Sequence, residues 1–219
     1  GKHLLNGVTD YYVSGAAASI DDLTIFGADI PKDQSSLVVN LSVTAPASNA
    51  IVQKDDIAGR SAGSSVHLQV TGNKGTSVVI LAASTTLSAI VAAVNNATDS
   101  TGVSAVASTD NANSGISFLS TEVGRMQFVQ IHDLDIDDNG TRWLDNQRDT
   151  GSDVTALING AKAQGEGLNV KFNSQQLKLQ MILDDNFDDG ATTAAPNTDR
   201  FDITSGGLRF QLGATTVAN

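Results

Sequence analysis

Apolar residues recur at every second position in several short stretches of the chain. Leu37, Val39, Leu41 and Val43 do so within residues 36–44, and residues 177–183 repeat the pattern. Alternation of this kind puts apolar side chains on one face of a strand, so it predicts half-buried β-strands. Other apolar runs, many rich in β-branched residues, predict further strands at residues 22–30, 65–70, 76–82, 103–108, 116–120, 127–131 and 168–172.

One central stretch has the spacing of a helix instead. Its apolar positions i, i+3, i+4 and i+7 are Leu87, Ile90, Val91 and Val94. These positions lie on one face of a helix, residues 84–86 (Ser-Thr-Thr) can provide its N-cap, and Gly102 ends it. A hairpin is predicted before this helix, with its turn at residues 71–75, and two strands are predicted after it. The sequence therefore predicts a β-β-α-β-β unit.

Composition limits the classes of function. The 219 residues are 40% hydrophobic and 17% charged, which is typical of a globular chain of one large or two small domains. The net charge of -11 argues against nucleic acid or an anionic membrane as a partner. There is no cysteine, so disulfides are excluded, and no apolar run approaches the roughly 20 residues that span a bilayer. Because the chain does not begin with Met, we expect it to be part of a longer protein.

Several segments, among them the two ends of the chain, carry recognisable sequence motifs. Residues 1–7 (G-K-H-L-L-N-G) and 207–214 (G-L-R-F-Q-L-G-A) are similar to the places where a flagellin leaves and re-enters its filament-forming core. Residues 71–107 resemble the motif of flagellins and hook-associated proteins named for its Ile-Asn pair, with Val94-Asn95 in its place. Residues 153–170 are similar to a hairpin found late in flagellin inserts, and Asn159-Gly160 is itself a hairpin turn signal.

The resemblance implies the surface-exposed variable region of a flagellin, flanked by fragments of the conserved core domain. We expect an α+β, predominantly β fold of two nested β-rich domains, with the β-β-α-β-β unit in the outer one. Residues 20–45 and 150–204 would form an inner, D2-like domain, and residues 46–149 an outer, D3-like domain that holds the Ile-Asn motif. Residues 1–19 would leave the core domain and residues 205–219 would return to it, which requires the two ends to lie close together.

The implied function is that of a non-catalytic structural subunit of the flagellar filament, which contributes to its surface and to motility. Its partners would be other flagellin subunits, and an export chaperone and apparatus would act on regions outside this chain. The location would be extracellular, after export in the unfolded state through the flagellar channel, and the isolated chain is expected to be a monomer. Two alternatives remain open: a flagellar cap or hook-associated protein domain, and a calcium-stabilised adhesin module that binds carbohydrate.

The calcium alternative depends on an acidic turn. Asp135, Asp137, Asn139 and Gly140 match positions 1, 3, 5 and 6 of an EF-hand loop. Position 12, however, is Asn146 instead of Glu, and a predicted strand precedes the turn where an EF-hand has a helix. A second acidic cluster covers residues 184–190. Solvated turns on an acidic protein explain both clusters more simply, so we expect no metal and no cofactor. Asp135, Asp137 and Asn139 remain the candidates for binding calcium.

Catalytic motifs are absent from the sequence. The three histidines have no metal-binding spacing, and there is neither a nucleophile elbow nor a phosphate-binding glycine loop, so we expect no enzyme. His67 is expected to be half-exposed on a strand, and His132 to pair with the acidic turn. Trp143, the only Trp, is expected near a domain junction.

Overall fold

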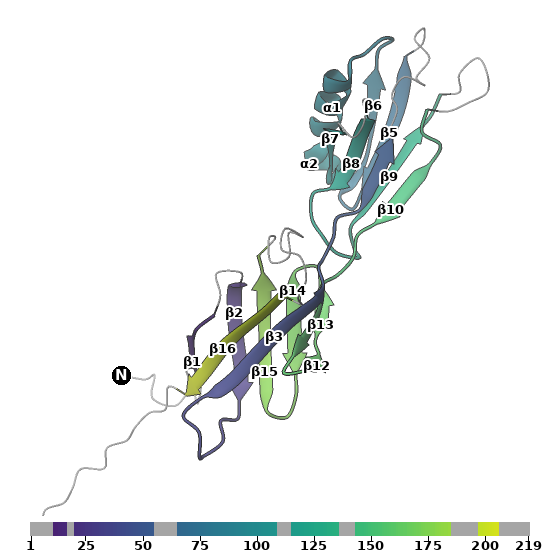
Figure 1. The fold of residues 1–219 in the computed structure, drawn as a ribbon. Helices are drawn as coiled ribbons and strands as arrows, with labels where there is room; N and C mark the ends of the chain where they lie inside the picture. The colour runs from purple at the N-terminus through teal and green to yellow at the C-terminus, as the bar shows by residue number, and fades with distance from the viewer. Residues whose placement is uncertain are drawn as a thin grey trace, which may run out of the picture.

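The computed structural model describes residues 11–16, 20–54, 65–108, 115–135, 143–184 and 197–205. Within them the chain is mainly β-structure with two short helices, which confirms the predicted α+β, predominantly β class. The described residues of 11–45 and 155–205 form an inner unit, and those of 51–150 form an outer unit. The two units lie end to end, joined by residues 46–50 and 151–154 (Figure 1).

The inner unit consists of two antiparallel sheets. The first contains, in spatial order, β1 (Tyr11–Ser14), β16 (Asn197–Ser205), β3 (Leu37–Ala45), β11 (Thr155–Ile158) and β12 (Ala161–Lys162). The second contains β13 (Gln164–Glu166), β14 (Asn169–Asn173), β15 (Leu177–Leu183) and β2 (Ile20–Ala28). The alternating apolar residues of β3 and β15 are buried in one shared core, to which Phe201 and Ile203 of β16 also belong. The strand pattern read from the sequence therefore identifies the core side of both sheets.

The outer unit also has two antiparallel sheets. The larger one contains, in spatial order, β10 (Gln147–Thr150), β9 (Phe128–Asp133), β5 (Val66–Gly72) and β6 (Gly75–Leu81). The smaller one contains β4 (Ile51–Lys54), β8 (Gly115–Ser120) and β7 (Val103–Ser108). A second core lies within this unit, with Leu68, Ile116, Phe118 and Ile131 fully buried. Each unit therefore has its own hydrophobic core.

The predicted helix is α1 (Leu87–Asn95), and a single turn, α2 (Thr98–Thr101), follows it. Thr86 is the N-cap, since its side chain accepts a hydrogen bond from the N–H of Ala89. Ile90 and Val94 are buried, so the predicted apolar face of α1 packs on the core of the outer unit. The order β5, β6, α1, α2, β7, β8 adds only the turn α2 to the predicted β-β-α-β-β unit.

The sequence did not predict several of the strands. Tyr11–Ser14 falls in the segment interpreted as a connector, but it pairs with β16, and the Tyr11 hydroxyl accepts a hydrogen bond from the N–H of Ala28 at 3.0 Å.

The predicted hairpin turn at Asn159-Gly160 does join β11 to β12, and both residues have positive φ, 50° and 80°. The rest of the two terminal segments, residues 1–10 and 206–219, lies outside the described residues.

Candidate functional site

The Val94-Asn95 pair at the end of α1 joins the helix to the smaller sheet. Val94 is fully buried in the core of the outer unit. The Asn95 side chain makes two hydrogen bonds with Ala105 of β7: Oδ1 accepts from the backbone N–H at 2.7 Å, and Nδ2 donates to the carbonyl oxygen at 3.0 Å. The amide therefore pairs with β7 as the backbone of another strand would. Because β7 pairs with β8 on its other side, this contact satisfies part of an open sheet edge.

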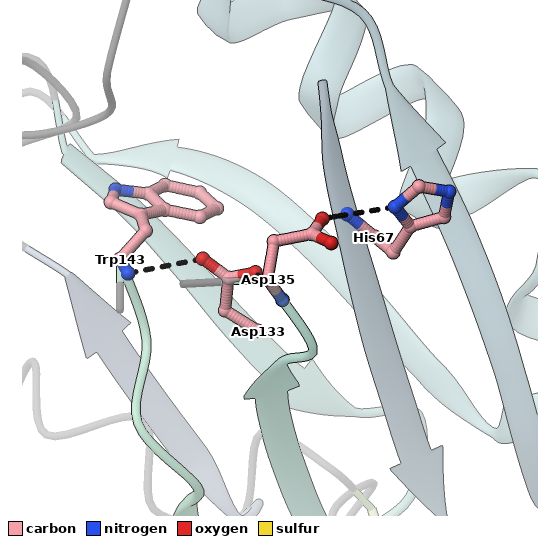
Figure 2. Close-up of polar contacts among 4 residues, drawn as sticks. All are labelled: His67, Asp133, Asp135 and Trp143. Atoms are coloured by element: carbon pink, nitrogen blue, oxygen red, sulfur yellow. Dashed lines mark hydrogen bonds and ion pairs between the residues drawn. The ribbon is translucent and has the colours of Figure 1, made fainter. Parts of the chain in front are cut away.

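A buried carboxylate organises the distal end of the outer unit (Figure 2). Asp133, at the end of β9, has only 3% of its surface exposed. Its Oδ1 accepts the N–H of Asp135 and its Oδ2 accepts the N–H of Trp143, each at 3.0 Å. A buried carboxylate needs such hydrogen bonds to offset its desolvation. Asp133 thus holds together the two chain segments that flank residues 136–142.

The first calcium candidate, Asp135, contacts His67 of β5. Its Oδ2 accepts the backbone N–H of His67 at 2.6 Å and lies 2.9 Å from the ring Nδ1 (Figure 2). The other two candidates, Asp137 and Asn139, lie outside the described residues, as do residues 185–190 of the second acidic cluster. Among the residues that the structure does describe, no group of three or more metal-binding side chains comes together. Calcium binding by these three residues stays a prediction.

Two expectations about single residues are wrong. Trp143 is 8% exposed and belongs to the core of the outer unit, at the distal end of β9 instead of the junction. His132 does not pair with the acidic turn: its Nδ1 is buried without a partner, and His67 makes the contact with Asp135. Strand alternation explains the second error, because His132 lies on the face opposite to its neighbour Asp133. His67 is half-exposed, as predicted, with 41% of its side chain accessible.

The junction between the two units centres on Asp153, whose side chain is 14% exposed. Its Oδ1 accepts the N–H of Arg125, from the outer unit, and the N–H of Gly167, from the inner unit, both at 2.9 Å. The Arg125 Nε lies 3.3 Å from Oδ2. Burial by itself would raise the pKa of Asp153, but the hydrogen bonds from Gly167 and Arg125, together with the Arg125 charge, lower the pKa below its ordinary value. The ionised form of Asp153 is therefore the one that the folded protein favours.

Backbone segments also approach one another closely at this junction. Ser48 and Ser152 exchange two backbone hydrogen bonds, of 2.9 and 3.1 Å, and the N–H of Gly124 also donates to the carbonyl of Ser48 at 3.1 Å. A Cβ on Gly124 would lie 2.9 Å from the Cα of Gly167, and a Cβ on Gly151 would lie 2.5 Å from the carbonyl oxygen of Ser48. Glycine is needed where backbones come this near. The two connections and one loop from each unit thus form a single packed joint.

A cleft of about 960 Å³ lies beside the joint. Glu122, Met126 and Gln127 of the outer unit line it, as do Asn169 and Ile182 of the inner unit. Oε1 of Gln127 and Oδ1 of Asn169 are buried there without a hydrogen-bond partner. This joint cannot be recognised from the sequence, because its residues come from four distant segments that form no motif. No helix among the described residues has the length and apolarity needed to cross a bilayer.

Comparison with known protein families identifies one motif in the chain. Residues 65–122 match the family model of the flagellin hook IN motif. This range includes β5, β6, both helices, β7 and β8, and therefore the Val94-Asn95 pair. No curated protein sequence matches the chain.

The solved structures that are similar to this chain include those of flagellar cap proteins. The D2-D3 domains of FliD from Escherichia coli are 17% identical, with a TM-score of 0.51, and the match covers 90% of this chain and 100% of that one. The D1-D2-D3 domains of the same protein give 18% identity and a TM-score of 0.49, and the chain spans 57% of their length. FliD from Bdellovibrio bacteriovorus gives 12% identity and a TM-score of 0.49, covering 86% of this chain and 98% of that one. At this identity the first match establishes a shared fold and no more.

Proposed function

We propose that this chain is the outer part of an axial flagellar protein, and specifically of a flagellar cap protein. The observation that carries the proposal is the match to the whole D2-D3 structure of the Escherichia coli cap protein over 90% of this chain. The flagellin hook IN motif supports the wider class of flagellar structural proteins. The filament subunit, which was the first interpretation of the sequence, shares the motif but is not the protein of the similar structures described above.

The proposal includes a division into domains. Residues 20–45 and 150–204 form the inner domain and residues 46–149 the outer domain, with residues 1–19 and 205–219 leading to a core domain, except that β1 (Tyr11–Ser14) pairs with β16 and so belongs with the inner domain. The two separate hydrophobic cores support this division, since one consists of residues from 37–43 and 154–203 and the other of residues from 50–144. The outer domain is then an insertion between β3 and β11.

The joint described above suggests a mechanical role for the chain. Charge-assisted hydrogen bonds from both units converge on the half-buried carboxylate of Asp153, and such bonds are stronger than neutral ones. A joint of this kind holds the outer unit at a fixed angle on the inner one. A structural protein that projects from a flagellum needs this stiffness and no catalytic group. Its partners are other axial flagellar subunits, and its location is outside the cell after export.

Immunoelectron microscopy tests the proposal. Antibodies raised against the 219-residue chain, coupled to gold, are applied to flagella isolated from the source bacterium, with pre-immune serum as the control. Label confined to the far tip of each filament supports the cap protein. Label along the whole length identifies a filament subunit, and label at the boundary between hook and filament identifies a hook-associated protein. Unlabelled flagella would remove the flagellar assignment itself.

A further inference from the structure

We propose that the cleft beside the joint binds an alkylammonium group, which is a positively charged –NH3⁺ at the end of an aliphatic chain. The inference goes beyond the proposed function, because it gives the chain a ligand site to which both units contribute. Free diamines and the side chain of lysine both carry such a group. The two sources share one chemistry, and titration with both distinguishes them.

The cleft has one wall from each unit. On the inner unit, Glu166, Asn169 and Ile182 are register partners across β13, β14 and β15, so their side chains lie on one face of that sheet. The opposite wall comes from the outer unit, where residues between β8 and β9 line the cleft. The volume of about 960 Å³ is that of a small-molecule site, and such sites are common where two domains meet.

Each wall carries one buried carbonyl oxygen that lacks a hydrogen-bond donor among the described residues. These are Oε1 of Gln127, a residue only 8% exposed, and Oδ1 of Asn169. Nε2 of Gln127 donates to Oε2 of Glu122 at 3.1 Å, which fixes the orientation of the amide, because the reverse orientation would place Oε1 against a carboxylate. An unpaired buried acceptor costs free energy, so a ligand that brings N–H donors to both oxygens is favoured.

The charge of the cleft is negative. Glu122, Asp153 and Glu166 line it, and no Lys, Arg or His is among the described residues that do. Asp153 is paired with Arg125, and Glu166 is paired with Lys171. Glu122 is exposed and has no basic partner in the part of the chain that the structure describes. The ligand that fits therefore carries a positive charge as well as N–H donors.

The apolar lining favours an organic cation over a metal ion. Met126 is 69% exposed and Ile182 is 39% exposed, one on each wall. These side chains can bind methylene groups but offer nothing to a metal ion, which needs several oxygen ligands around it. An ammonium group also matches the acceptors in number, because it donates three hydrogen bonds and the cleft offers Glu122, Gln127 and Asn169.

Binding requires a small movement of the wall, because both carbonyl oxygens are covered by neighbouring atoms. Met126 can supply this movement, since it lines the same wall as Gln127 and its side chain is unbranched and exposed. In the bound state the thioether of Met126 would pack on the methylene groups of the ligand. Water could satisfy the two oxygens, but it would leave the charge of Glu122 and the apolar side chains without a partner.

Titration followed by NMR of the nitrogen-labelled 219-residue chain tests the proposal. The probe is cadaverine, a five-carbon diamine, with an expected dissociation constant of about 1 mM. It should shift the side-chain amide signals of Gln127 and Asn169. Two controls match its length: the five-carbon diol has donors but no charge, and permethylated cadaverine has charge but no N–H. Each control should bind about tenfold more weakly.

A further titration with Nα-acetyl-lysine methylamide separates the two sources of the group. Affinity equal to that of cadaverine would identify the lysine of a protein as the ligand, and affinity about tenfold lower would identify a free diamine. Cleft signals that no probe shifts at about 10 mM would overturn the proposal, and water alone would then satisfy the two oxygens. Equal binding of cadaverine and either length-matched control would overturn it as well.

Two variants locate the site. Glu122→Gln removes the unpaired charge, and Gln127→Met removes the unpaired oxygen at nearly constant length, so each should weaken cadaverine binding about tenfold. Asp99→Asn on α2 and Gln53→Met on β4 are the matched controls, because both residues are exposed and neither lines the cleft. Circular dichroism establishes that the variants fold, and the exposed position of Glu122 makes its variant the safer of the two.

Equal affinities of Glu122→Gln and Asp99→Asn for cadaverine would contradict the proposed site, whatever the behaviour of Gln127→Met. None of these measurements depends on the flagellar assignment. A negative result here would therefore leave the gold-labelling experiment unaffected, and unlabelled flagella would leave the cleft proposal unaffected.

Discussion

The N–H of Gly167 donates to Oδ1 of Asp153 at 2.9 Å, and the same oxygen accepts the N–H of Arg125 at 2.9 Å. Gly167 belongs to the inner unit and Arg125 to the outer unit. One carboxylate oxygen therefore connects two units that have separate cores. Because the oxygen is shared, a change that weakens one of these bonds by moving the carboxylate also weakens the other.

Asp153→Ala should lower the free energy of unfolding by about 2–4 kcal/mol, because it removes two hydrogen bonds to a charged group and leaves their donors unpaired. Urea unfolding followed by circular dichroism measures the loss. Asp21→Ala is the matched control: Asp21 is exposed on β2, so its replacement should change stability by less than about 0.5 kcal/mol. Equal stabilities of the two variants would show that the junction does not depend on this carboxylate.

The contribution of Asp153 should depend on pH. Its folded-state pKa lies below the ordinary value of 3.8, so the ionised carboxylate stabilises the folded protein fully above that value. The stabilisation is lost as the pH falls through the folded-state pKa. The difference in unfolding free energy between wild type and Asp153→Asn should therefore be constant between about pH 7 and pH 5, and shrink below about pH 4. Urea midpoints of both proteins at several pH values measure it, and a difference that grows on acidification would contradict the assignment.

Elements with a strong pattern of their own could be predicted from the sequence. Buried residues alternate along β3 and β15 as the sequence indicates, and the helical spacing of residues 87–94 gave α1. The turn at Asn159-Gly160 followed from local chemistry, because both residues adopt positive φ. In these places local preference and tertiary structure agree.

Elements defined by their partners could not be predicted. The four residues of β10 are all exposed and polar, and the strand forms because its backbone pairs with β9. The same limit applies to the junction, where Asp153 and three glycines meet only after the chain has folded. The predicted position of Trp143 was wrong because a single Trp in a sequence is compatible with either place, the core of a domain or the boundary between two domains.

Gly151→Ala should destabilise the junction by about 2 kcal/mol or more, because the added Cβ would meet backbone atoms that cannot move independently. It would lie 2.5 Å from the carbonyl oxygen of Ser48 and 2.6 Å from that of Gly124. Gly27→Ala is the control, since a Cβ there would meet nothing within 4 Å. Thermal unfolding should separate the two variants by several degrees. If Gly151→Ala melted with the control, the close backbone packing would be contradicted.

Asn95→Ala should lower the stability of the outer unit by about 1 kcal/mol, because the two hydrogen bonds to Ala105 are lost. Asn96→Ala provides the comparison: Asn96 is the next residue, is exposed, and caps α1 only through its backbone. Urea unfolding of the two variants measures the difference. Similar stabilities would mean that the motif asparagine does not hold α1 against β7.

Asp133→Asn should open the distal end of the outer unit, and the only Trp of the chain can report it. The carboxylate of Asp133 accepts the N–H groups of Asp135 and Trp143, and an amide offers one acceptor oxygen where the carboxylate offers two. The expected loss is about 1–3 kcal/mol, with a red shift of Trp143 emission as its indole gains contact with water. Fluorescence spectra with an iodide quencher measure this exposure, and Asp21→Asn in the inner unit is the control. Unchanged emission and quenching in Asp133→Asn would show that Trp143 is held by core packing alone.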